Sequence, residues 1–295
     1  MVTKLGTVIT AMVTPFTDTL GLDLDQMARL TDRLIDMGSD GLLVTGTTGE
    51  SPTLSFEEKV SLWKTVIKTA RGRVPVMLGT GSNSTMDSIA LTQKAEEVGG
   101  DAILLVSPYY NKPPQNALYE HFKKVAGATT LPVMIYNVPG RTACNIEPDT
   151  VVRLANDVPN IVALKEAGGS LDQVSEICRR VPSQFTVYSG DDSFTLPMLA
   201  VGAKGIVSVA SHLIAGQIQE MISSFTQGKW EIAKEIHQKY FPVFKGLFFT
   251  TSPAPVKAAL GLMGFPVGGL RQPLLPLTDN EVTQLKNILK QAALI

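Results

Sequence analysis

The sequence predicts an α/β fold, a closed (β/α)8 barrel of the TIM type with a C-terminal helical extension. Three observations support this prediction. Short runs rich in Val, Ile and Leu recur along the first two thirds of the chain. Their nearly continuous apolar character is typical of parallel strands covered on both faces. Helix-length segments with capping signals separate them, and eight strands alternating with helices favour a closed barrel.

The expected strands are short and apolar. They lie at residues 7–10, 41–44, 74–78, 102–106, 132–136, 161–164, 185–188 and 205–209. A doubly wound open sheet is the alternative, and it would usually begin with a glycine-rich phosphate-binding turn after the first strand. Thr14-Pro15-Phe16 follows the first run instead. This segment therefore favours the barrel over the open sheet.

Start and stop signals mark the expected helices. Ser55 stands three residues before Glu58, which is the spacing of a capping box, and the same spacing of polar residues recurs at 84–87 and 170–173. Gly38 follows the last apolar position of the first helical segment, as a helix C-terminus requires. The alternation of strand and helix is thus supported at both ends of several segments.

The pattern changes after the eighth strand. Residues 213–225 supply the eighth barrel helix. Three further helices are expected, at residues 230–249, 255–263 and 280–294. No polar or Gly/Ser-rich linker precedes them, so the prediction is a catalytic barrel at 1–225 with a helical extension at 226–295 packed on it.

Composition excludes several classes of function. The 295 residues contain 26 Lys and Arg against 27 Asp and Glu, and this near-neutral balance argues against a nucleic-acid partner. Two cysteines, Cys144 and Cys178, form no disulfide framework, which fits a reducing compartment. We find neither a signal-peptide pattern nor an apolar run long enough to span a membrane. The expected location is the cytoplasm.

Lys165 is the sharpest candidate for chemistry, because it follows the sixth run at the barrel end where active sites lie. Strand alternation places it on one face with Ala163, and it places Val162 and Leu164 on the other. A lysine beneath apolar walls has a lowered pKa, and its free amine can attack a carbonyl to form a Schiff base. The alternative is a structural ion pair with Glu166 or with another acid at the rim.

Three other features lie at the same end. Tyr136 ends the neighbouring strand at an equivalent height and could relay protons, or it could simply fill the barrel mouth. Arg141 suits a substrate carboxylate, although a surface salt bridge is the default for an isolated arginine. The Gly-Thr-Thr-Gly-Glu turn at 46–50 offers two hydroxyls and a close backbone approach to a small carboxylate.

Other patterns are weaker. Residues 79–84 lack the third glycine of a dinucleotide fingerprint and predict a barrel loop before a capped helix. Asp191 and Asp192 could chelate a hard cation, but a solvated helix N-terminus is favoured. The three histidines are too far apart in sequence to indicate a metal site: His121, His212 and His237.

Five segments, in this order, make the sequence similar to the dihydrodipicolinate synthase family of pyruvate-dependent class I aldolases. They are GTTGES at 46–51, PYYNKP at 108–113, YNVPGRT at 136–142, KEA at 165–167 and SGDD at 189–192. The resemblance runs from Leu5 to the C-terminal helices. The lysine and the GTTGE turn are features of the whole superfamily, whereas the paired tyrosines and the segment with Arg141 are more specific to the synthase.

The resemblance implies condensation of pyruvate with L-aspartate 4-semialdehyde on the route to diaminopimelate and lysine, with no metal or organic cofactor. The implied catalytic residues are Lys165, Tyr136, Thr47 and Tyr110. The implied substrate-binding residues are Thr48, Val207, Arg141 and Gly190. Tyr110 would come from a neighbouring subunit, and a homotetramer built as a dimer of dimers is the family expectation.

Two rival functions remain at this stage. N-acetylneuraminate lyase and 2-keto-3-deoxy sugar acid aldolases share the lysine, the tyrosine and the turn, but Arg141 favours the semialdehyde as substrate. A non-catalytic barrel is disfavoured, because binding alone needs no imine-forming amine such as that of Lys165.

Regulation departs from the family pattern. Members inhibited by lysine commonly carry histidines on the helix after the GTTGES turn, where this chain has Phe56 and Lys59. A cationic Lys59 would repel the ammonium group of a lysine ligand, although Asn83, Asp87 and Tyr109 occupy matching places. We therefore predict weak or absent inhibition by lysine.

Overall fold

Eight parallel strands close into a barrel in the computed structural model of the chain, which describes residues 5–295. The strands are β1 (Val8–Ala11), β2 (Gly41–Val44), β3 (Val76–Gly79), β4 (Ala102–Val106), β5 (Val133–Asn137), β6 (Ile161–Glu166), β7 (Thr186–Ser189) and β8 (Gly205–Ser208). Each strand pairs with its neighbours in sequence, and β8 pairs with β1. The predicted barrel is confirmed, and the open-sheet alternative is wrong.

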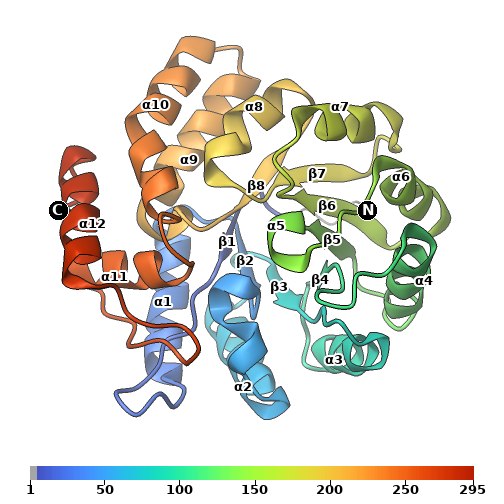
Figure 1. Cartoon of the computed structure of the whole chain (residues 1–295), viewed down its shortest axis with the longest axis horizontal. Coiled ribbons are helices and arrows are strands. Elements are labelled where there is room, and N and C mark those ends of the chain that lie inside the picture. Colours follow the sequence, from blue (N-terminus) through green and yellow to red (C-terminus); the bar gives the residue numbers. More distant parts are fainter. Residues whose placement is uncertain (1–4) are drawn as a thin grey trace.

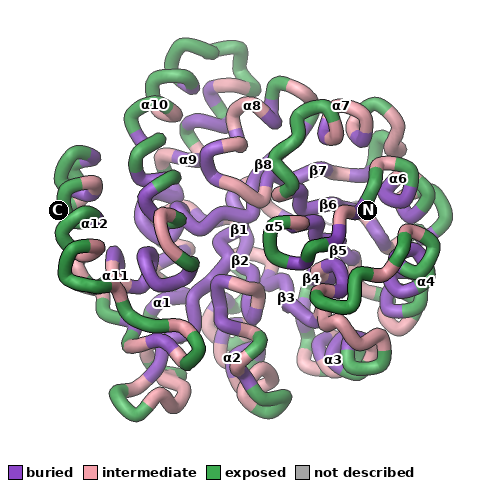
Figure 2. Tube along the Cα trace, viewed as in Figure 1, coloured by how far each residue is buried: buried purple, intermediate pink, exposed green. Residues whose placement is uncertain are grey.

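A ring of helices surrounds the strands, with the green exposed faces outward and the purple buried strands at the centre (Figure 1, Figure 2). The ring is formed by α1 (Leu24–Asp36), α2 (Phe56–Ala70), α3 (Thr85–Glu97), α4 (Gln115–Ala126), α6 (Pro148–Asp157), α7 (Leu171–Arg180), α8 (Thr195–Ala200) and α9 (Ser211–Thr226). Four short helices lie in the loops: η1 (Thr47–Gly49), η2 (Ser51–Thr53), α5 (Pro139–Thr142) and η3 (Asp192–Phe194). Of these, α5 lies over the mouth of the barrel (Figure 1).

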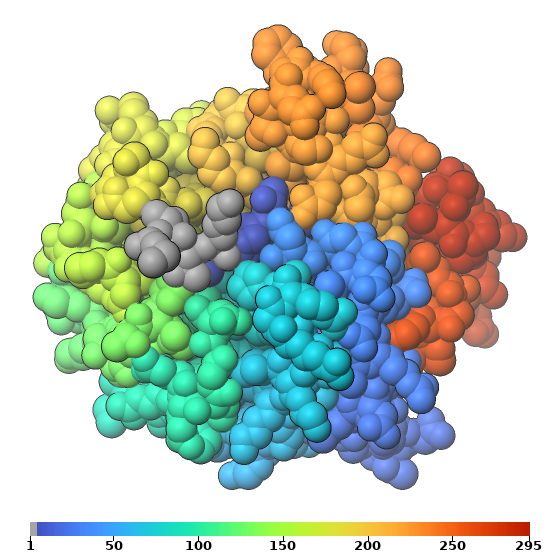
Figure 3. Space-filling model, turned by 180° about the vertical axis from the view of Figure 1, so that it is seen from behind, coloured from blue at the N-terminus to red at the C-terminus, as the bar shows by residue number. Residues whose placement is uncertain are grey.

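The extension consists of α10 (Trp230–Gly246), α11 (Ala254–Leu262) and α12 (Asp279–Gln291). Helix α10 packs against α9, and α12 packs against α10 and α11. Seen from behind, the red and orange C-terminal segments lie on one side of the barrel, next to the blue N-terminal part (Figure 3). The Arg33 guanidinium of α1 lies 5.0 Å from the ring centroid of Phe265, which is one contact across this boundary.

Two helices begin with a complete reciprocal capping box, and the first of them is at the predicted Ser55. At the start of α2, the Ser55 hydroxyl accepts from the backbone N–H of Glu58, and the Glu58 carboxylate accepts from that of Ser55. The same reciprocal bonds begin α12 at residues 278–281. At 170–173 only the serine half forms, because the Gln173 amide donates to Glu166 instead. Side chains near the barrel mouth thus take precedence over local capping there.

The apolar core has two layers. Inside the barrel, Met134, Ala163 and Val207 belong to one cluster of buried side chains, whereas Leu164 belongs to the larger cluster between strands and helices. The pairing of β5 with β6 shifts between Val133 and Met134, so residue 162 is an extra residue in β6. The expectation that residues 162 and 164 share a face is therefore wrong, because this irregularity interrupts the alternation before Ala163.

No helix in the described range 5–295 is both long and apolar enough to cross a bilayer.

The seam between β8 and its neighbours depends on a glycine. A Cβ added at Gly205 would lie 3.0 Å from Cε1 of Tyr188 and would overlap the carbonyl oxygen of Thr7. We predict that Gly205→Ala lowers the free energy of unfolding by about 1–3 kcal/mol, the usual effect of overpacking. Urea titration of both proteins measures it.

The matched control is Gly261→Ala in α11, where an added Cβ meets no atom within 4 Å. This change in a helix is expected to leave stability unchanged or raise it by up to about 1 kcal/mol. An equal loss of stability in both variants would contradict the packing argument at Gly205.

Candidate active site

The strand register brings a lysine between two tyrosines in the interior of the barrel. Lys165 on β6 is the register partner of Tyr136 on β5 and of Tyr188 on β7. Each of the three side chains is 6% exposed. The Lys165 ammonium nitrogen lies 4.1 Å from the centroid of the Tyr136 ring. The sequence placed Tyr136 beside Lys165 at equal height, and the register agrees.

Burial changes the proton affinity of both groups. Loss of water around the amine lowers the pKa of Lys165 to about 7, with a smaller opposing effect from the nearby Asp192 carboxylate and a further lowering from Arg141. Burial raises the pKa of Tyr136 to about 12, and Arg141 partly opposes that rise. At neutral pH a substantial fraction of Lys165 is therefore an uncharged amine, while Tyr136 keeps its proton.

The alternative of an ion pair between Lys165 and Glu166 is wrong. Glu166 points to the outer side of the strand, where its carboxylate accepts bonds from the Asn137 and Gln173 amides and from the backbone of Gly168. Burial raises the pKa of Glu166, and these bonds oppose the rise. The Lys165 amine instead lies against the ring of Tyr136 in the barrel interior.

Gly190 leaves space for the lysine side chain. An added Cβ at this position would lie 3.0 Å from Cε and 3.1 Å from Cγ of Lys165, and 2.9 Å from Cβ of Ala167. The backbone N–H of Gly190 donates to the Glu166 carbonyl at 2.7 Å, which fixes this close approach. Any larger residue would displace the amine from its place beside Tyr136.

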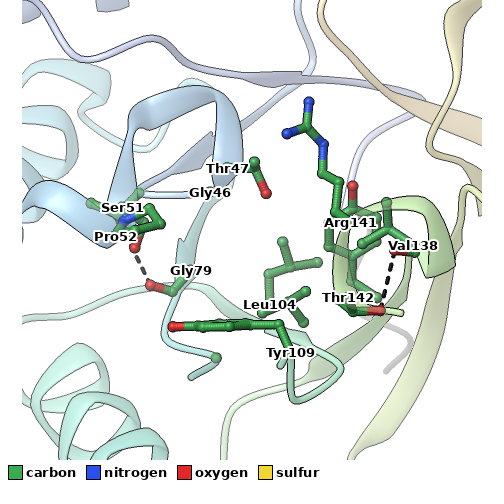
Figure 4. A pocket seen from close by; sticks show the side chains of 14 residues that line it. Gly46, Thr47, Ser51, Pro52, Gly79, Leu104, Tyr109, Val138, Arg141 and Thr142 are labelled. Carbon is green, nitrogen blue, oxygen red and sulfur yellow. Dashed lines mark hydrogen bonds between the residues drawn. The ribbon is translucent and has the colours of Figure 1, made fainter. Parts of the chain in front are cut away.

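A cavity of about 220 Å³ opens at this end of the barrel, and its wall includes Thr47, Tyr136 and Arg141. Figure 4 shows Ser51 and Pro52 on one side of the cavity and Val138 on the other, with the side chains of Thr47 and Arg141 between them. Leu104, Val106 and Val138 give the wall an apolar part. An apolar cavity with a cation at its mouth and a hydroxyl on each side suits a small carboxylic acid.

The turn at 46–50 is held by residues to which the sequence assigned no such role. Thr45 precedes it with φ +58°, a strained conformation for a β-branched residue. Its hydroxyl donates to the Gly79 carbonyl at 3.0 Å and accepts from the Trp63 indole at 2.8 Å. Thr14 donates to the Gly49 carbonyl at 2.6 Å. The sequence could not reveal these roles. A threonine before a glycine does not indicate a positive φ, and Trp63 and Thr14 act through contacts with residues distant in the sequence.

The remaining predicted residues fall into two groups. Thr48 is buried within η1, and Val207 is 1% exposed in the interior cluster that also contains Tyr136. Tyr110 is not brought to the others: its side chain is 89% exposed, its φ is +73°, and it is not part of the cavity wall. Its neighbour Tyr109 lines the cavity instead.

The expectation of a solvated pair at 191–192 is wrong for Asp192. Asp191 does cap η3, accepting from Ser193. Asp192 is only 2% exposed; Ser208 donates to it, and so do the backbone N–H groups of Val209 and Ala210 at 3.2 and 3.1 Å. Burial raises its pKa to about 6. The sequence missed this role because it depends on β8 folding back beside β7.

Other candidates take structural places. Residues 79–84 form a strand end and loop before the Ser84-capped helix α3, as predicted. His212 is fully buried, where it accepts from the Val13 backbone at 3.1 Å and bonds the Val209 carbonyl at 2.8 Å. His121 bonds Thr85. Within residues 5–295, no three acidic, histidine or cysteine side chains are grouped so as to hold a metal ion.

Known proteins resemble this chain along its whole length. A family model for the dihydrodipicolinate synthetase family matches residues 4–292. The 4-hydroxy-tetrahydrodipicolinate synthase of Desulforudis audaxviator is 56% identical over 295 residues, covering 100% of both chains. The corresponding synthase of Bacillus subtilis is 52% identical over 286 residues, covering 97% of this chain and 99% of its own.

Solved structures agree. Dihydrodipicolinate synthase from Bacillus anthracis superposes with a TM-score of 0.95 at 52% identity, covering 97% of this chain and 98% of its own. The enzyme from Cyanidioschyzon merolae, described with lysine bound, superposes with a TM-score of 0.97 at 45% identity, covering 99% of each chain. The chain therefore belongs to the dihydrodipicolinate synthetase family.

Proposed function

We propose that this chain is a lyase that condenses pyruvate with L-aspartate 4-semialdehyde, the reaction implied by its resemblance to the 4-hydroxy-tetrahydrodipicolinate synthases. The observation that carries the proposal is the buried amine of Lys165 beside Tyr136, with a pKa of about 7. An amine that is uncharged at neutral pH, and that lies against a tyrosine ring lining the cavity, is suited to form an imine.

The first step is attack of the uncharged Lys165 nitrogen on the keto carbon of pyruvate. With uptake of one proton, the keto oxygen leaves as water and a protonated imine remains. The positive nitrogen withdraws electrons from the adjacent carbon, so the pyruvate methyl group loses a proton and becomes an enamine. Thr48 and the backbone of Val207 hold the pyruvate carboxylate end in this proposal. The close packing of Gly190 against the Lys165 side chain supports the attack step, because it restricts the position of the amine nitrogen.

The second step forms a carbon–carbon bond. The enamine attacks the aldehyde carbon of the semialdehyde, and the aldehyde oxygen, on which negative charge develops, takes up a proton and becomes a hydroxyl group. Tyr136 is the proton donor and acceptor, because burial keeps its hydroxyl protonated within the site. Thr47 and Tyr110 continue the relay to solvent. A positioned proton-transfer group of this kind contributes about 10²–10⁴-fold in rate.

Arg141 selects the second substrate. Its guanidinium lies in the cavity wall on the exposed helix α5, where it can bind the semialdehyde carboxylate through two parallel bonds. A sugar acid would instead need hydroxyl-binding groups along a longer cavity. The small cavity and its cation favour the semialdehyde over N-acetylneuraminate or 2-keto-3-deoxy sugar acids.

We infer that a second copy of the chain completes each site. The exposed ring of Tyr110 cannot serve its own cavity from where it lies, and a position at the rim suits insertion into a neighbour. A homotetramer, as a dimer of dimers, remains the assembly proposed. A cytoplasmic location, and the division into a barrel at 1–225 and an extension at 226–295, also stay predictions.

Reductive trapping tests the central claim. Treatment with pyruvate and borohydride should add the mass of a reduced pyruvate adduct to the peptide containing Lys165, and Lys165→Ala should abolish both trapping and condensation. The same preparations are then assayed with the semialdehyde and with N-acetylneuraminate. An adduct on a different lysine, or turnover of the sugar acid alone, would sink the proposal.

The pH dependence gives a sharper test. The rate of adduct formation should rise with a midpoint near pH 7 as Lys165 loses its proton, whereas an ordinary lysine titrates near 10.4. Because the Asp192 carboxylate raises this pKa, Asp192→Asn should move the midpoint lower. Cyanoborohydride trapping followed by mass spectrometry at several pH values gives both midpoints. A rate that climbs steadily to pH 10 would contradict a buried amine.

Mixing variants tests the shared site. Lys165→Ala and Tyr110→Phe should each be nearly inactive alone, yet a hybrid dimer keeps one intact site. Random reassociation of equal amounts should therefore restore about a quarter of the normal activity. Variants mixed without dissociation serve as the control. Failure to recover activity in verified hybrids would show that Tyr110 serves its own subunit or none.

Lysine should inhibit weakly or not at all. Burial lowers the pKa of Lys59 on α2, and the nearby Asp87 carboxylate opposes this lowering. Asp87 therefore already interacts with one ammonium group, that of Lys59, and is less able to bind the ammonium group of a lysine ligand. Activity measured across a lysine titration should stay nearly flat, and Lys59→His should increase the sensitivity. Strong inhibition of the parent at submillimolar lysine is the opposite result.

A further inference from the structure

A buried ion pair joins the C-terminal extension to the turn that carries Thr47. Glu50 follows η1, and Lys257 lies on α11. The Lys257 ammonium nitrogen is 2.7 Å from Oε1 of Glu50, and the two side chains are 3% and 1% exposed. Lys257 also donates to the Gly269 carbonyl at 2.6 Å and lies 4.3 Å from the ring centroid of Phe16.

Glu50 connects this pair directly to the turn. Its backbone N–H donates to the Thr47 carbonyl at 3.0 Å, and its own carbonyl accepts from the Thr53 N–H at 3.0 Å. Its φ is +55°, a left-handed conformation that a residue with a side chain keeps only when its surroundings impose it. The second carboxylate oxygen of Glu50, Oε2, accepts a hydrogen bond from the backbone N–H of Arg271 at 3.0 Å. Both oxygens of Glu50 thus bind the extension.

Attachment of the extension does not require these charges. Val256 and Leu260 on α11 are completely buried and already supply apolar contact. The Arg271 guanidinium makes a separate anchor to Glu58, at 2.6 Å, and to the Thr53 carbonyl, at 2.8 Å. A buried ion pair adds little net stability, because removing both charges from water offsets their attraction. Its well-attested use is to fix one arrangement among several.

We propose that Lys257 is a positioning residue for the condensation: through Glu50 it fixes the turn at 46–50 and thereby places the hydroxyls of Thr47 and Thr48. The extension then contributes to turnover without touching substrate. This inference rests on the proposed function, since it assigns the turn a part in that reaction. A displaced threonine weakens pyruvate binding and the proton relay, while Lys165 keeps its own surroundings in the barrel.

The test uses the full-length double variant Glu50→Gln with Lys257→Met, which removes both charges and leaves no unpaired buried ion. We expect a thermal midpoint near that of the parent, and kcat/KM for pyruvate lower by about 10–100-fold, the usual effect of a small misplacement. Adding Thr47→Val to the double variant should lower activity much less than Thr47→Val lowers it in the parent, because the Thr47 hydroxyl of the double variant is already misplaced and contributes little.

Two control variants separate positioning from attachment. Arg271→Met loosens the other anchor and should lower the thermal midpoint more than it lowers kcat. Lys234→Met removes an exposed pair with Glu231 on α10 and should change neither quantity. Normal kcat and KM in the double variant, or fully additive losses with Thr47→Val, would overturn the inference. Borohydride trapping of pyruvate on the parent is run first, since its failure would count against the proposed function instead.

Discussion

The burial of one amine is the constraint on which this structure depends. Lys165 can stand inside the barrel only because small or flat neighbours surround it: Gly190 against its stem and the Tyr136 ring 4.1 Å from its nitrogen. Burial costs the charged form of the amine, so its pKa falls to about 7. A surface lysine would keep its charge and would be a poor nucleophile. The unfavourable placement of this group is thus what makes it chemically useful.

Keeping such a group in place requires a rigid frame around it. The closed ring supplies that frame, since every strand is paired on both sides and Lys165 has register partners on β5 and β7. Outside the ring, the Glu166 carboxylate accepts hydrogen bonds from the Asn137 and Gln173 amides. The adjacent residues Lys165 and Glu166 thus lie on opposite faces of β6. The next strand end is tied by Asp192, which binds the backbone after β8. Buried carboxylates therefore fix the ends of β5, β6, β7 and β8, on either side of the amine.

The sequence predicted the fold well because apolar periodicity is a local signal. All eight expected runs overlap strands, and the helices of the extension lie where the pattern placed them. The position of Lys165 beside Tyr136 was also predictable, since each stands at the carboxyl end of its apolar run. The bulge near residue 162 was not, because a register shift depends on the partner strand. Buried polar residues were equally invisible: Asp192 and Thr45 owe their roles to contacts made by distant segments.

Tyr110 and Lys257 represent opposite ways in which a barrel can extend its active site. Tyr110 is exposed on a rim loop, and loops of this kind can reach another copy of the chain. Lys257 belongs to a segment beyond the eight strands, yet its ammonium group is buried against the turn after β2. The strands fix the amine in the barrel interior, but they cannot fix loops that project beyond their ends. Such loops need contacts from outside the ring, and the extension is the part of this chain that supplies one.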